Sequence, residues 1–208
     1  MKTNYQLILE KTLSEISSKA LRPKLLLHAC CAPCSSYVIE YLTNFFDITL
    51  LYYNPNITPE EEHSARANEL VRLTKEMANL KNVSVVVTDY TPQDFYAISK
   101  NLENEREGGP RCFKCYRLRL TYSAEYAKEH GFDYFTTTLS ISPHKNAEVL
   151  NTIGSELSEK YGVPYLLSDF KKKNGYRRSC ELSEQYNLYR QDFCGCEFSK
   201  AAAEKRES

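Results

Sequence analysis

Short apolar runs alternate along this chain with longer stretches of helical spacing. The runs are rich in β-branched, leucine and aromatic residues, as strands are, and they span 25–29, 48–53, 83–87, 132–138 and 163–167. The stretches between them resemble amphipathic helices and span 35–42, 59–79, 112–130 and 145–161. Strands that alternate with helices pair in parallel, because each helix returns the chain to the same end of the sheet. We therefore predict an open, parallel α/β sheet of five strands.

The two ends of the chain extend this predicted sheet. Residues 5–20 have helical spacing, and no strand signal follows residue 171. We expect an N-terminal helical extension at 1–23, one Rossmann-like α/β domain at 24–199 and a frayed tail at 200–208. The length of 208 residues suits one domain that folds without disulfides. Gly131 and Gly162 are expected at helix C-caps.

The eight cysteines indicate metal binding or thiol chemistry. No stretch has the roughly 18 consecutive apolar residues that a membrane helix requires, and residues 1–23 contain charges and no apolar signal core. We therefore expect a cytoplasmic protein with no membrane partner. In a reducing cytosol, such a number of cysteines does not indicate a disulfide framework.

Cationic side chains gather in two places although the formal net charge is zero. Affinity for nucleic acid would have to come from such local patches. The first patch contains five cations and no acid: Lys171, Lys172, Lys173, Arg177 and Arg178. The second surrounds a cysteine pair: Arg111, Lys114, Arg117 and Arg119. We predict that the first patch contacts RNA phosphates, the alternative being a solvated basic loop.

Three cysteines follow the first predicted strand, where a parallel sheet places its ligands. They belong to the motif His28-Ala-Cys30-Cys31-Ala-Pro33-Cys34. The amides and positive dipole of a helix start lower the pKa of a nearby thiol and favour the thiolate that binds metals. The alternative is a set of buried core cysteines.

Cys112 and Cys115 form a second pair at the start of a predicted helix. Thiols spaced i and i+3 lie on one side of a helical turn. Together with the first motif they predict a four-thiolate site for zinc or a [4Fe-4S] cluster, and the number of thiolates does not separate the two. A thioredoxin-like dithiol is the alternative, but that motif directly follows a strand, whereas Gly108-Gly-Pro-Arg precedes this pair.

Cys194 and Cys196 form a third group with one glycine between them. A disulfide across one residue is strained and easily reduced, which favours a redox-active pair. Two unreacted surface thiols are the alternative. Cys180 has no partner by these patterns and is interpreted as a core or surface thiol, with a ligand or resolving role left open.

These motifs, with several others in the same order, resemble the QueH-type epoxyqueuosine reductases from about residue 24 to 199. The others are Tyr53-Asn-Pro-Asn-Ile57, Glu62-x-x-x-Arg66, Gly109-x-Arg-Cys112 and Ser140-x-Ser-Pro-His144-Lys145. The resemblance implies a two-electron reduction of epoxyqueuosine to queuosine at the tRNA wobble position, the last step of queuosine biosynthesis. It also implies a fold related to the ATP-pyrophosphatases (HUP-type), in which cysteines here replace the phosphate-binding loop.

The resemblance further implies the roles of the cysteines. Cys30, Cys31, Cys112 and Cys115 match the proposed ligands of the [4Fe-4S] cluster, and Cys194 with Cys196 matches the proposed redox-active disulfide. Cys34 is a candidate ligand of an additional iron ion. The implied partners are tRNA carrying epoxyqueuosine and an electron donor.

Other polar residues near the strand ends are candidates for the chemistry. His144, Lys145 and Tyr53 are candidate proton donors or substrate binders, or else helix caps and solvated loop residues. Asn54, Asn56 and Arg66 suit a base edge, ribose or phosphate. Equally, the asparagines can form a turn, and Arg66 can pair with Glu62 one helical turn earlier.

Two other functions are consistent with the same cysteines. One is a zinc-stabilised nucleic-acid-binding module, which would be colourless where an iron-sulfur protein is brown. The other is a thiol-disulfide oxidoreductase acting on protein partners, which would stay active after metal removal.

Overall fold

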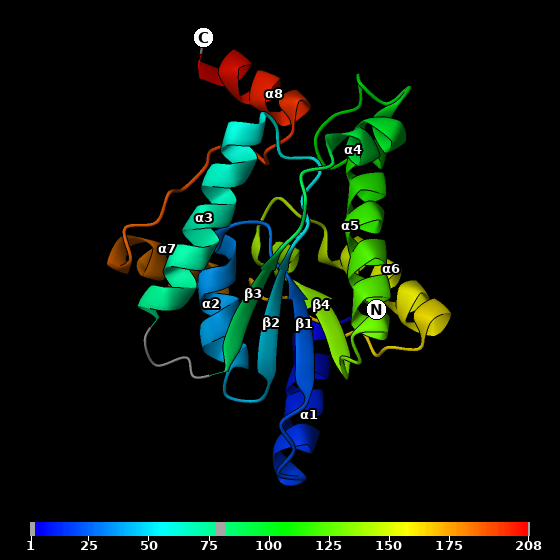
Figure 1. Cartoon of the computed structure of the whole chain (residues 1–208), viewed down its shortest axis with the longest axis vertical. Helices are drawn as coiled ribbons and strands as arrows, with labels where there is room; N and C mark the ends of the chain where they lie inside the picture. The colour runs from blue at the N-terminus through cyan, green and yellow to red at the C-terminus, as the bar shows by residue number, and fades with distance from the viewer. Residues whose placement is uncertain (1–2, 78–81, 208) are drawn as a thin grey trace.

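The computed structural model describes residues 3–77 and 82–207 and contains a parallel sheet of four strands in the order β3-β2-β1-β4 (Figure 1). The strands are β1 (Lys24–His28), β2 (Asp47–Tyr52), β3 (Val83–Val87) and β4 (Tyr134–Thr137). β1 is central and pairs in parallel with both β2 and β4. The predicted open, parallel, Rossmann-like α/β fold is confirmed.

The prediction of a fifth strand at 163–167 is wrong. This segment makes a single parallel bridge, between Phe135 and Tyr165. Pro164 accepts one hydrogen bond from Phe135 through its carbonyl but has no N–H to donate. The N–H of Tyr165 donates instead to the side chain of Ser158. The N–H of Leu166 donates to the carbonyl of Phe135 at 2.9 Å and completes the bridge, but the carbonyl of Leu166 accepts from the hydroxyl of Thr136, so the ladder goes no further.

Five helices lie where helical spacing predicts them, within a few residues, although residues 78 and 79 of the predicted stretch 59–79 lie outside the described ranges. They are α1 (Tyr5–Ser18), α2 (Ala32–Leu42), α3 (Glu60–Glu76), α5 (Pro110–Glu129) and α6 (Ala147–Tyr161). Gly162 caps α6 and Gly131 follows α5, both with positive φ, as expected. Three further helical segments were not predicted: α4 (Pro92–Ser99), η1 (Thr138–Ile141) and α7 (Gly175–Gln185). The expected tail, for which partial helix is one interpretation of the sequence, lies largely in α8 (Glu197–Glu207).

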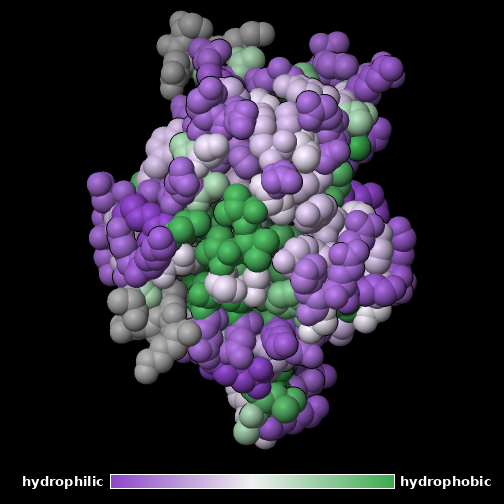
Figure 2. Space-filling view, viewed as in Figure 1, coloured by the Kyte–Doolittle hydropathy of each residue, from purple (hydrophilic) through white to green (hydrophobic). Residues whose placement is uncertain are grey.

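Successive side chains of the strands point to opposite faces of the sheet and pack in two different apolar cores. Leu25 and Leu27 of β1 belong to the core shared with α1, α2 and α3, whereas Leu26 belongs to the core shared with α5 and α6. In Figure 1, α2 and α3 accordingly lie on one side of the strands and α5 and α6 on the other. Apolar side chains also gather at the centre of the face shown in Figure 2, where Figure 1 shows the strands. No helix of the described residues is long and apolar enough to cross a membrane.

The carboxyl ends of the parallel strands lead into the segments that form the candidate site. β1 runs through Cys30 and Cys31 into α2, and β4 runs into η1. Because parallel strands end at one edge of the sheet, these two connections meet there. The C-terminal chain returns to the same edge, where the N–H of Thr58 donates to the carbonyl of Gly195 at 3.0 Å.

Candidate functional site

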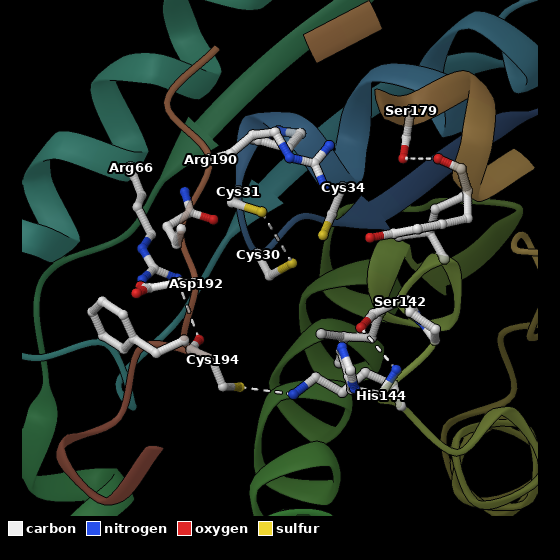
Figure 3. Close-up of a pocket in the computed structure, with 18 of the residues that line it drawn as sticks. Cys30, Cys31, Cys34, Arg66, Ser142, His144, Ser179, Arg190, Asp192 and Cys194 are labelled. Atoms are coloured by element: carbon white, nitrogen blue, oxygen red, sulfur yellow. Dashed lines mark hydrogen bonds between the residues drawn. The ribbon is translucent and has the colours of Figure 1, made fainter. Parts of the chain in front are cut away.

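Three thiols lie together where β1 ends. The Sγ atoms of Cys30, Cys31 and Cys34 all lie within 4.8 Å of one another, and those of Cys30 and Cys31 are 3.7 Å apart (Figure 3). Cys31 is the N-cap of α2, and Pro33 stands in its first turn. The strand-to-helix turn therefore presents the thiols as the sequence predicts, and Cys34 joins Cys30 and Cys31.

The three thiols share one negative charge. Hydrogen bonds from Cys31 and then Cys34 hold the pKa of Cys30 well below its ordinary value. The same contacts with Cys30 raise the pKa values of Cys31 and Cys34. Cys30 is therefore the thiolate of the group, and the other two donate to it.

The buried side chain of His28 fixes the end of β1. Burial, followed by the nearby Arg119 charge, lowers the pKa of His28 to about 4, so its imidazole is neutral. Its Nε2 lies 3.2 Å from the carbonyl of Tyr53, which can only accept, so Nε2–H is the donor. Its Nδ1 then accepts from the Thr137 hydroxyl, 2.9 Å away. His28 thus joins the ends of β1, β2 and β4 beneath the thiols.

A buried arginine, Arg119, lies near cysteines of the first motif and near cysteines of a second group, which α5 and the C-terminal segment supply. Arg119 is 1% exposed, and its Nη2 has no hydrogen-bond partner. No carboxylate of the described residues forms an ion pair with it. Burial lowers the pKa of its guanidinium, but the sulfurs of Cys115, Cys194 and Cys30 raise it by more. Arg119 therefore places a positive charge near the sulfurs of both groups.

The second group of cysteines is assembled from α5 and the C-terminal segment. The Sγ of Cys112 accepts a hydrogen bond from the N–H of Gly108 at 3.2 Å. Cys115 packs with Cys196 in a small apolar cluster, and burial raises the pKa of Cys115 to about 11. Cys112 and Cys115 lie outside the 4.8 Å group of the first motif. All eight cysteines, Cys194 and Cys196 included, are free thiols.

A cavity of about 300 Å³ opens between these groups. Figure 3 shows the three thiols of the first motif on one side of it and Cys194 on the other. The remaining wall includes Arg66, Arg119, His144 and Lys145, together with the segment 190–193. Thiols from both ends of the chain therefore face one cavity.

Comparison with known proteins gives the family of this chain. The family profile described as "Epoxyqueuosine reductase QueH" matches residues 25–202. The chain belongs to the QueH family. It is 43% identical over 201 residues to the epoxyqueuosine reductase QueH of Streptococcus pyogenes serotype M1, covering 95% of this chain and 78% of that protein. It is 34% identical over 188 residues to the protein of the same name from Thermotoga maritima, covering 88% and 92%.

The candidate proton donors lie at different places in this QueH-family chain. Lys145 is buried at the cavity, and its Nζ donates to the Sγ of Cys194 at 2.8 Å. His144 is exposed and also lines the cavity. The hydroxyl of Tyr53 instead donates to Asp94 at 2.9 Å, and Tyr53 is not among the residues of the cavity wall.

Asn54, Asn56 and Arg66 are all buried. The side-chain amide of Asn54 donates to the carbonyl of Ala29 at 2.9 Å, which holds the turn before Cys30. The Oδ1 of Asn56 has no partner among the described residues. Arg66 pairs with Glu62 at 2.6 Å, the alternative that helical spacing offered, and its Nη1 also donates to the carbonyl of Cys194.

The two basic patches have different outcomes. The second group of cations does not form a patch that is free to bind nucleic acid, because Arg111 and Arg119 are buried and Arg117 pairs with Glu156. In the first patch four cations pair with carboxylates of this chain: Lys171 with Asp169, Lys173 with Glu10, Arg177 with Glu181 and Arg178 with Glu40. Residues 171–173 also line a second cavity of about 780 Å³, which shares 143–145 with the first.

Sequence reasoning missed two parts of the site. Arg119 was grouped with surface cations, although its position four residues after Cys115 predicts one helical face for both. The wall formed by 190–193 was also missed. This segment has no periodicity, and its place depends on Arg66, whose guanidinium carbon lies 5.1 Å from the ring centroid of Phe193.

Proposed function

We propose that this chain reduces epoxyqueuosine to queuosine at the wobble position of tRNA. The observation that carries the proposal is the single cavity that Cys30, Cys31, Cys34 and Cys194 face together. Membership of the QueH family supports the substrate, because the relatives carry the name epoxyqueuosine reductase. A cavity lined by thiols suits reduction better than hydrolysis or group transfer.

Cysteines at the cavity and on α5 fit an iron-sulfur centre. We assign Cys30, Cys31, Cys112 and Cys115 as ligands of a [4Fe-4S] cluster, which when bound would supply electrons one at a time. The donors are thiols, as such clusters require. Arg119 offers an unpartnered, buried Nη2 beside them, which suits the negative charge of a thiolate-bound cluster.

Cys34 is assigned to an additional iron ion. The Sγ of Cys34 lies within 4.8 Å of the Sγ atoms of Cys30 and Cys31. An iron ion bound to Cys34 would therefore lie next to these two cluster ligands.

The Cys194-Cys196 pair is assigned as the two-electron carrier. Removing the epoxide oxygen breaks two C–O bonds, forms a C=C bond and releases water. A dithiol that becomes a disulfide supplies the two electrons and two protons that this step consumes. An external electron donor then reduces the disulfide. Gly195, with φ of +117°, permits the tight backbone between the two cysteines.

Metal and sulfide analysis of anaerobically purified protein, combined with single- and multiple-turnover assays on epoxyqueuosine-containing tRNA, tests the proposal. We expect brown protein with iron and sulfide, and Cys112→Ser should lose the cluster absorption. Cys194→Ser and Cys196→Ser should keep that absorption and lose multiple turnover. Cys180→Ser, which removes a thiol on α7 outside the cavity wall, is the matched control and should retain both.

Three results would contradict these assignments. Colourless protein that contains zinc would favour the binding module over the reductase. A Cys112→Ser variant with full cluster content would remove Cys112 from the ligand set. Wild-type multiple turnover by both Cys194→Ser and Cys196→Ser would exclude the dithiol as the electron carrier.

A further inference from the structure

The two thiols of the Cys194-Cys196 pair have different surroundings. Cys194 lines the cavity. Cys196 is 7% exposed and packs with Phe95 and Cys115 in an apolar cluster, where its Sγ donates to the hydroxyl of Ser199 at 3.4 Å. A molecule in the cavity therefore meets Cys194 before Cys196.

A buried cation contacts the exposed member of the pair. Lys145 is 8% exposed, and its Nζ lies 2.8 Å from the Sγ of Cys194 (dashed line in Figure 3). Its carboxylate neighbour, Glu107, is farther away, at 3.8 Å. Burial lowers the pKa of Lys145, but the charges of Cys194 and Tyr116 and the hydrogen bond to Cys194 together outweigh burial, and the net shift is upward. An ammonium buried in this way requires an anion in contact with it.

We propose that Lys145 is a positioning residue that holds the sulfur of Cys194 at the substrate cavity and stabilises negative charge that develops on it, and so makes Cys194 the thiol of the pair that reacts first. The proposal rests on the function proposed above, which makes this pair the electron carrier. Lys145 then acts through Cys194 and is not the proton donor to the substrate. A thiolate reacts far faster than a thiol, so the contact decides the order of reaction.

Other charged groups around the contact favour the same assignment. Arg66 of α3 donates to the backbone carbonyl of Cys194, and Arg119 of α5 adds positive charge nearby. Glu107 is the acid that opposes them. The titratable groups that interact with Lys145 or Cys194 are Tyr116 and Cys115 of α5, Cys196, and the charged groups just named.

Site-resolved alkylation of the anaerobic, metal-loaded protein by iodoacetamide tests the proposal. In the wild-type protein we expect Cys194 to react at least about tenfold faster than Cys196 at pH 7. Lys145→Met should slow Cys194 about tenfold at that pH and move its pH profile upward, because the stabilising cation is gone. Lys145→Arg keeps the charge and should keep most of the wild-type rate. Lys160→Met, an exposed lysine on α6, is the matched control.

Cys180 is an internal reference for folding, since its alkylation rate should be equal in all variants. An unchanged Cys194 profile in Lys145→Met overturns the proposal. If the Cys180 rate shows that Lys145→Met is misfolded, the alkylation rates of the wild-type protein test the proposal instead. Equal rates for Cys196 and Cys194 in the wild-type protein would then overturn the proposal. Alkylation needs no epoxyqueuosine, so failure of the reductase assay and failure of this proposal are distinguishable.

Discussion

The imidazole of His63 makes the stability of the folded chain depend on pH. It is 4% exposed and packs between Tyr52 and Tyr90, with ring centroids 4.9 and 4.8 Å away. Burial lowers its pKa from the ordinary value of 6.5. The unfolded chain therefore binds this proton first as the pH falls below about 6.5, and protonation favours unfolding. The stability that neutral, buried His63 contributes is fully present at neutral pH and decreases as the pH falls.

Urea unfolding at pH 7.5 and 5.5 measures this effect. Between these values the wild-type protein should lose up to about 1.4 kcal/mol more than His63→Gln, which is the limit for one histidine that stays neutral when folded. His130→Gln changes an exposed histidine and should keep the wild-type pH dependence. Equal losses in wild type and His63→Gln would show that His63 does not carry the effect.

Single residues at the site could be predicted where their chemistry is visible in the sequence. Cys30, Cys31 and Cys34 could be placed together because a strand end and a helix start determine their spacing. The contact between Lys145 and Cys194 could not, because the two residues are 49 positions apart and meet through tertiary packing. Nor does a sequence show that Arg119 is buried without a carboxylate.

At the scale of elements, Gly195 joins the C-terminal segment to α3. A Cβ at Gly195 would lie 2.9 Å from Cγ1 of Ile57 and 3.1 Å from Nη1 of Arg66, on a backbone with φ of +117°. Gly195→Ala should therefore displace Cys194 from the cavity, at a cost of about 1–3 kcal/mol. We expect turnover of epoxyqueuosine to fall at least about tenfold while the cluster absorption stays, as measured by steady-state assay and visible spectrum.

Gly131→Ala measures the cost of a positive φ alone, without the close contacts that a Cβ would make at residue 195. Gly131 also has positive φ, but a Cβ there would meet nothing within 4 Å. The variant should lose about 1 kcal/mol of stability and keep wild-type turnover. Wild-type turnover by Gly195→Ala as well would mean that the position of Cys194 does not depend on this close approach.

Helices were predictable where an apolar stripe faces the core, and were missed where small or polar residues pack instead. α1 buries Leu9, Leu13 and Ile16 at helical spacing, and its position was predicted. α7 buries Gly175, Ser179, Leu182 and Ser183. Only Leu182 among these four is a large apolar residue, so few apolar side chains mark the helix, and α7 was missed although it packs on α2. α4 is 8 residues long and too short for the same signal.

At the scale of the whole molecule, the two cavities connect the thiols to the basic patch of 171–178. Residues 143–145 belong to both cavity walls, and Lys171, Lys172 and Lys173 line the second. A nucleotide in the first cavity would therefore have its neighbours along the strand near these lysines. The fold class was predictable from alternating strands and helices. This connection was not, because it depends on how the N-terminal helix meets the 143–148 loop.

Replacing the five cations Lys171, Lys172, Lys173, Arg177 and Arg178 by glutamine tests whether the patch binds tRNA. Four of them pair with carboxylates here, but the pairs of Lys173, Arg177 and Arg178 are largely exposed and contribute at most about 1 kcal/mol each, so RNA phosphates can displace those carboxylates. Each cation that binds a phosphate releases counterions. Affinity should therefore fall, and the slope of log affinity against log salt should flatten by roughly 0.7 to 0.9 for each phosphate that is no longer neutralised.

Filter binding of epoxyqueuosine-containing tRNA between 50 and 200 mM salt, roughly the range over which phosphate neutralisation dominates affinity, measures both quantities. Lys75, Lys128 and Lys160, which are exposed on α3, α5 and α6, provide a charge-matched triple glutamine control for a 171–173 triple variant. The 171–173 triple variant should lose more affinity for tRNA than a double variant of Arg177 and Arg178, because only the lysines line the second cavity. If the five-residue variant binds tRNA with wild-type affinity and slope, the patch is a solvated basic surface and the RNA follows another path to the thiols.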